Sequence, residues 1–337
     1  MKKSKTFFAC AMLAALASCS NDHVLSQQSP TPSDPDVINI VAASSKPVTR
    51  AAENATKLQN TQFFTDETIN VYLSEHTTET PVITYGNPWV FKVSNSVGSD
   101  GEVTLTPPDG ITPKFPSNNN GVDAYALYPT SVTATDNGTF TVPTDQSDDE
   151  KYRNADMMFG TNKFNSSGQE IESFTGTPKG SKVALYFKHQ LSKVIVKMDV
   201  NSFSSGFLTG ATIKLKGVKN EFTYKASKNG VEGISLTGDA TVEVKLGTYA
   251  DAGNACIIAP QDVAAETEFI EITTNGNPAK TYVYKIPTGS PKTFESGKKY
   301  IYNIKLSGGS LVVVSTKIEE WGTGETVDGT ADLKTES

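Results

Sequence analysis

The sequence predicts an all-β protein built from antiparallel β-sandwiches, and two features of the chain carry that prediction. Short runs with alternating apolar and polar residues, rich in β-branched and aromatic side chains, recur along most of the chain after residue 50. Turn sequences such as "GSDG", "PPDG" and "KNG" separate these runs. No long amphipathic helix pattern interrupts them, and only residues 150–160 suggest a short helical turn. Many short strands at this spacing are typical of sandwiches.

The alternation is clearest in two runs. In "KVIVKMDV" (193–200), one face carries valine and methionine and the other carries lysine, aspartate and one isoleucine. In "YIYNIKL" (300–306), one face carries tyrosine, isoleucine and leucine. Strands of the same kind are predicted at 69–73, 89–93, 102–106, 124–129, 183–187, 211–217, 241–246, 268–274 and 280–287.

The N-terminus has the features of a bacterial export signal. Lysines precede "FFACAMLAALAS" (7–18), an apolar run too short to span a bilayer core of roughly 30 Å as a helix. The run ends in "LASC", which resembles a lipobox, in which Cys19 receives a diacylglycerol and becomes the new N-terminus. We therefore expect a lipid anchor and no spanning helix. The alternative is an ordinary signal peptide with an incidental cysteine.

A removable strand is predicted between the signal and the main body. Residues 20–36 are polar and rich in serine and proline, so they should form a flexible tether. The apolar run that follows predicts a strand from Val37, Ile38, Ile40 and Val41. A polar stretch then leads to Arg50, which precedes two alanines. A strand placed upstream of an exposed basic residue suggests that cleavage removes it.

Four stretches together resemble the fimbrillin family, the type V pilins (Mfa-like, fimbrillin-like lipoprotein subunits) of anaerobic Gram-negative bacteria of gut and mouth. They are "NADMMFG" (154–160), "VALYFKHQLSKVIVKM" (183–198), "TFESGKKYIYNIKL" (293–306) and "VSTKIEEWGTG" (314–324). No single one of them is specific, but their order is. The resemblance covers the lipobox, the arginine and most of the chain from about 150 to 322, whereas 65–150 matches only in general character.

The resemblance implies two transthyretin-like antiparallel β-sandwich domains in tandem. We place them at 51–178 and 179–337, after a signal peptide (1–18) and a lipidated tether with the removable strand (19–50). It also implies export as a lipoprotein to the outer membrane and cell surface. An Arg-specific protease would then cut after Arg50 and leave Ala51 as the mature N-terminus.

That cut would remove the lipid, the tether and the predicted strand together. A sandwich that loses a strand exposes an apolar groove flanked by unpaired backbone groups, which a strand from another subunit can fill. The predicted function is therefore a structural subunit of a fimbrium (pilus), assembled by donor-strand exchange. The alternative is that 37–50 is only a linker and Arg50 an incidental surface residue.

The C-terminal residues do not decide which position this subunit would take in a fimbrium. Residues 309–321 predict a strand, a candidate donor or edge strand with Val312, Val314, Thr316 and Ile318 on one side. The segment 322–337 that follows is polar and is a poor donor by itself. Stalk and tip roles both remain open, and the polar end favours a tip or adhesive subunit.

Composition and motifs argue against nucleic-acid binding, catalysis and bound cofactors or metals. Thirty basic and 37 acidic residues give a net charge of −7 without a basic cluster outside the signal, which argues against nucleic acid. Cys256 alone remains once Cys10 is removed and Cys19 is lipidated, so we expect a buried thiol and no internal disulfide. The acidic cluster 145–150 lacks EF-hand spacing and is interpreted as a solvated loop. We predict no catalytic residue, cofactor or metal.

Two other classes of function stay open. A non-polymerising glycan-binding outer-membrane lipoprotein would keep its lipid and stack sugars on aromatic residues, but Trp89 and Trp321 adjoin strand-like runs, which favours core packing. A secreted hydrolase would need acidic residues clustered in a cleft. For the fimbrial hypothesis, the expected partners are other fimbrial subunits, the protease, the outer membrane through the acyl (palmitate) lipid, and a receptor on a host or bacterial surface.

Overall fold

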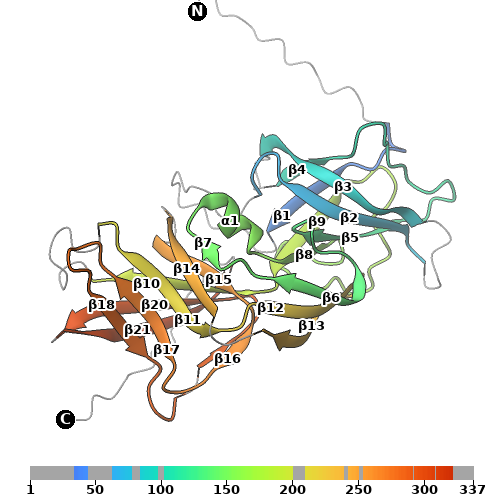
Figure 1. The fold of residues 1–337 in the computed structure, drawn as a ribbon. Coiled ribbons are helices and arrows are strands. Elements are labelled where there is room, and N and C mark those ends of the chain that lie inside the picture. The colour runs from blue at the N-terminus through green and yellow to red at the C-terminus, as the bar shows by residue number, and fades with distance from the viewer. Residues whose placement is uncertain are drawn as a thin grey trace, which may run out of the picture. The chain divides into compact units, whose positions relative to one another are not determined.

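The computed structural model describes residues 34–44, 63–77, 84–97, 102–199, 209–238, 242–249, 253–290, 292–307 and 309–321. These residues confirm the all-β fold: they form 21 strands and one short helix, α1 (Asp149–Asn154) (Figure 1). All of them belong to one unit of the chain, which runs from Asp34 to Ser337.

The first sheet closes on itself, because β9 pairs with β1 as well as with β8. Its side chains enclose a core of aliphatic and aromatic residues. The strands follow the order β1 (Ile40–Ser44), β4 (Val103–Thr106), β3 (Thr84–Val97), β2 (Thr68–Glu75), β5 (Val122–Tyr128), β8 (Met158–Thr161) and β9 (Val183–His189).

The second sheet is open and has its own core, which contains the buried cysteine. Its order is β18 (Thr281–Lys285), β17 (Glu268–Thr273), β11 (Thr212–Val218), β14 (Val242–Tyr249), β15 (Gly253–Ile258), β10 (Ser192–Met198), β20 (Lys298–Ser307) and β21 (Ser310–Glu320), and β7 (Asp145–Gln146) pairs with β14. Cys256 is 0% exposed, which confirms the predicted buried thiol, and this burial raises the pKa of the thiol.

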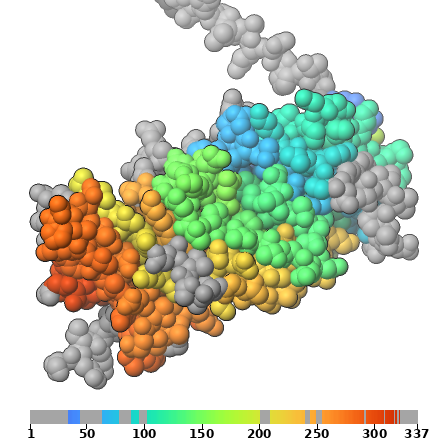
Figure 2. Space-filling model, in the orientation of Figure 1, coloured from blue at the N-terminus to red at the C-terminus, as the bar shows by residue number. Residues whose placement is uncertain are grey.

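A third sheet connects residues from both halves of the chain. It has the order β13 (Gly230–Thr237), β12 (Glu221–Ser227) and β6 (Thr135–Thr141), and a small sheet pairs β16 (Gln261–Val263) with β19 (Lys292–Phe294). On the face drawn in Figure 2, the green region of β6 and the yellow-to-gold β12–β13 hairpin lie side by side. The predicted domain boundary at 178/179 remains a prediction; β9, which follows it, pairs within the first sheet.

The predicted helical turn is confirmed, and it uses part of the acidic cluster. Asp148 is the N-cap of α1, where its carboxylate accepts a hydrogen bond of 2.9 Å from the backbone N–H of Lys151. Carboxylates at this position satisfy an N–H that the helix itself leaves unpaired. The cluster therefore has a structural use that the interpretation as a solvated loop did not include.

The predicted common face of β21 is wrong. Val312 and Val314 are 37% and 56% exposed, whereas Ile318 lies opposite Tyr300 and packs against the core of the second sheet. The cause is a register shift in the β20–β21 ladder, opposite Val314, which moves the residues after it to the other face. The predicted common face of 300–306 is confirmed by the buried side chains of Tyr300, Tyr302 and Ile304.

Candidate functional site

The predicted removable strand lies in the wall of the first sheet, between β4 and β9 (Figure 1). Its ladder is antiparallel to β4, with Ile40 opposite Leu105, and parallel to β9, with Ile40 opposite Val183. The ladder begins at Ile40 and ends at Ser44, so it extends three residues beyond the predicted run 37–41. β1 is therefore an inner strand, with both backbone edges paired.

The residues that precede β1 are also held on two sides. On the β4 side, Val37 forms a bridge with Lys114, and the N–H of Ile38 donates to the carbonyl of Pro113 at 2.9 Å. On the β9 side, the N–H of Val183 donates to the carbonyl of Asn39 at 2.9 Å.

One ion pair adds to these backbone contacts. The ammonium of Lys179 lies 2.5 Å from the Asp36 carboxylate, and its hydrogen bond lowers the pKa of that carboxyl. Exposed pairs of this kind contribute little to stability, so main-chain pairing and apolar burial hold the segment.

The inward face of β1 and of the residues before it belongs to the core of the first sheet, and on the other face Val41 and Ala43 are buried as well, at 8% exposure each, outside that core cluster. Ile38, Ile40 and Ala42 are 4%, 1% and 0% exposed and belong to the core of the first sheet, whereas Asn39 is exposed. Burial of one isoleucine side chain contributes about 1.5–3 kcal/mol. Loss of this segment would open an apolar groove with unpaired backbone groups on both β4 and β9.

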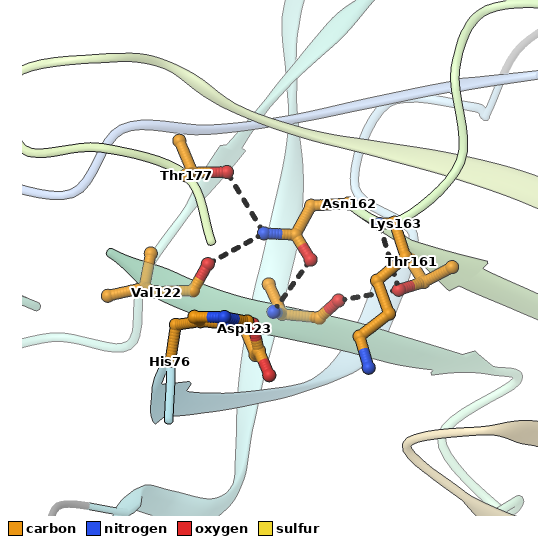
Figure 3. A network of polar contacts seen from close by, with 8 residues as sticks. His76, Val122, Asp123, Thr161, Asn162, Lys163 and Thr177 are labelled. Carbon is orange, nitrogen blue, oxygen red and sulfur yellow. Dashed lines mark hydrogen bonds and ion pairs between the residues drawn. The ribbon is translucent and has the colours of Figure 1, made fainter. Parts of the chain in front are cut away.

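A buried polar network holds the chain segment that leads into β9 (Figure 3). The side-chain amide of Asn162 donates to the carbonyl of Val122 and to the hydroxyl of Thr177, each at 2.9 Å. Its oxygen accepts a bond of 2.9 Å from the N–H of Ala124. Thr177 and Val122 also exchange two backbone hydrogen bonds. The network therefore positions the entry to one wall of the groove.

His76 belongs to the same region. Its Nδ1 lies 2.7 Å from Oδ1 of Asp123, and its ring meets the ring of Phe174 edge-on. The sequence gave no signal for Asn162 or Thr177, because their partners lie 15 to 55 residues away along the chain (177 − 122 = 55).

Removing the central amide of this network tests how far it supports the first sheet. We expect Asn162→Ala to lower the free energy of unfolding by about 2–3 kcal/mol, because buried backbone groups lose their partner. Thr177→Val removes only one of the three side-chain bonds and should cost about 1 kcal/mol. Urea unfolding of both variants measures the difference, and equal losses would contradict a central role for Asn162.

A second cluster lies where the first sheet meets the second. Nδ1 of His189 is 2.8 Å from the buried Asp156 carboxylate, and the Trp321 ring stacks on the imidazole at 3.9 Å between centroids. The ammonium of Lys193, whose residue is fully buried, lies 5.7 Å from the Trp321 ring. Trp321 is 6% exposed, which confirms the predicted core packing and prevents this ring from stacking on a glycan.

The remaining predicted sites are placed as follows. Cys19, Arg50 and Ala51 lie outside the described residues. Within the described ranges, no group of three or more histidine, cysteine or acidic side chains is arranged to hold a metal ion. None of the helices in the described part of the chain has the length and apolar character needed to cross a bilayer.

Comparison with known proteins identifies the family. The fold is similar to that of a protein from Bacteroides uniformis described as a cell adhesion protein, with a TM-score of 0.60 and 23% identity over 86% of this chain and 100% of that one. A second such protein, from Bacteroides ovatus, has a TM-score of 0.58 and 17% identity over 85% and 97%. A search of curated proteins found no match. Residues 49–321 match the fimbrillin-like family, whose members are fimbrial and adhesion proteins and not enzymes, and the chain therefore belongs to that family.

Proposed function

We propose that this chain is a fimbrial subunit that is exported as a lipoprotein acylated on Cys19, cut after Arg50, and assembled when a strand of another subunit replaces β1. Family membership supports the general part, a cell-surface subunit of a fimbrium that binds other subunits. In this proposal the lipid holds the precursor at the outer membrane, an Arg-specific protease releases it, and the two main sheets belong to two transthyretin-like sandwiches.

The position of β1 in the chain is the observation that carries this proposal. The strand ends at Ser44, six residues before Arg50, and it precedes every other described strand. One cut after Arg50 therefore separates β1 from the rest of the protein, whereas removal of an internal strand would need two cuts. No further bond would hold β1 covalently, since the buried Cys256 is free.

Replacement of β1 would restore what its removal takes away. An incoming strand can pair with β4 and β9 at once and can place alternate side chains in the positions of Ile38, Ile40 and Ala42. A contact of this kind joins different surfaces of two subunits, which is the type of contact that builds open filaments when it repeats from subunit to subunit. In the uncut precursor, β1 occupies the groove and prevents assembly.

The C-terminal end supports a tip or adhesive subunit. β21 is paired with β20 from Ser310 to Glu320 and ends at the buried Trp321, so it is part of the second sheet. A strand held in this way is not available to a neighbour. In this proposal the chain accepts a strand and does not donate one.

The mature N-terminus tests the proposal, by mass spectrometry of the protein isolated from cells with an active protease. We expect a chain that begins at Ala51. Arg50→Ala should keep the precursor lipidated and unassembled, whereas Lys46→Ala, a basic residue of the same segment, should mature normally. A wild-type chain that begins at acylated Cys19 would show that β1 stays in place and that the cleavage mechanism is wrong.

A further inference from the structure

We propose that the groove left by β1 selects its donor strand by side-chain size, and that the donor comes from a different kind of subunit and not from a second copy of this chain. The donor carries two large aliphatic residues and then one small residue at alternate positions. This inference rests on the proposed function, because it concerns the strand that replaces β1.

The size rule follows from the three inward positions of the segment. Ile38 and Ile40 place large branched side chains in the core, but Ala42, two residues on, places only a methyl group there and is 0% exposed. Ala42 lies opposite Val103 on β4 and Leu185 on β9, both of which are buried. Protein cores are packed as densely as crystals, so a larger side chain at position 42 would force its neighbours apart.

The direction of the donor is fixed by the two walls. β1 runs antiparallel to β4 and parallel to β9, and these two ladders have different hydrogen-bond patterns. A strand bound in the opposite direction would be parallel to β4 and antiparallel to β9. Its small residue would then lie at position 38 and not at position 42. The order large, large, small therefore applies from the N-terminus to the C-terminus of the donor.

The sequence of residues 322–337, which follow the last described strand, does not have that order of side chains. In 322–337 the large aliphatic residues are Val327 and Leu333, which are six positions apart, so no two fall at successive alternate positions. Leu311, Val313 and Ser315 have the required order, but the first two are 6% and 4% exposed in the core of the second sheet. Their release would break the β20–β21 ladder. A second copy is therefore a poor donor.

Competition between peptides tests the size rule. A chain with a site-specific protease sequence in place of residues 45–50 is cut in its folded form, and a fluorescent peptide of residues 36–44 (DVINIVAAS) is exchanged into it. Unlabelled peptides then compete. We expect the Ala42→Leu peptide to compete about tenfold more weakly than the native one. The matched control, Asn39→Leu, adds the same side chain at an exposed position and should compete about as well as the native peptide.

The outcomes distinguish a failure of the proposed function from a failure of the size rule. If the native peptide does not enter the cut protein, the proposed function fails, whatever the size rule. If it enters and Ala42→Leu competes equally, the groove exists but does not select by size.

The source of the donor has its own test. The cut protein incubated alone should remain unpolymerised, and a peptide of 322–337 should not compete. Filaments of cut protein alone would show that a second copy is the donor.

Discussion

Replacing Ile40 with aspartate is expected to displace β1 from its place between β4 and β9, so that the full-length chain binds a peptide of residues 36–44. Ile40 is 1% exposed and contributes to the core of the first sheet, so a carboxylate there would lose its hydration. The cost should exceed the about 2–5 kcal/mol of an isoleucine-to-alanine truncation. Urea unfolding measures the loss of stability, and binding of the labelled 36–44 peptide to the uncut protein measures the opened groove.

The neighbouring residue provides the control for this experiment. Asn39→Asp introduces the same charge at an exposed position of the same segment and should change neither stability nor peptide binding by much. An Ile40→Asp precursor that remains closed to the peptide and as stable as the wild type would mean that β1 does not fill the groove as described.

Replacing Trp321 with alanine is expected to lower the free energy of unfolding by about 3–5 kcal/mol, the usual loss for a buried tryptophan. The ring fills a position between His189 and the core formed by residues of both main sheets. Its backbone N–H also donates to the carbonyl of Gly297 at 2.7 Å, which fixes the end of β21. Calorimetric or urea unfolding measures the change.

Two further variants test whether the loss of stability comes from the stacked tryptophan ring. Trp321→Phe retains an aromatic ring that can stack on His189 and should cost less than the alanine variant. Val314→Ala alters an exposed residue of the same strand and should stay within about 0.5 kcal/mol of the wild type. A loss for Trp321→Ala as small as that for Val314→Ala would contradict the role of the stacked cluster in joining the sheets.

Local patterns predicted the elements of this fold well, because alternation is a property of neighbouring residues. The apolar faces of 194–198 and 300–306, the strand upstream of Arg50 and the buried cysteine were all evident from a few consecutive positions. The same method placed Val312, Val314 and Ile318 on one face of β21, which is wrong. The register shift that separates them arises in the pairing with β20, so the alternation of β21 alone does not reveal it.

Long-range features could not be derived in this way. Alternation assigns Lys193 to the polar face of β10, yet the residue is 0% exposed, because that face is covered by a core that contains Tyr152 and Trp321. The Asn162 network joins residues on β5 to the loop before β9, and no short motif marks it. Contacts of this kind become evident only when the strands are placed in space.

The two partners of β1 have a consequence for the order of folding. Ile40 pairs with Leu105, 65 residues later (105 − 40), and with Val183, 143 residues later (183 − 40). A chain made from its N-terminus thus produces β1 first but cannot complete both of its ladders until β9 is present. Contacts so distant in sequence form slowly, since a long loop must close before they are made. We therefore expect completion of the two β1 ladders to be a late, slow phase of refolding.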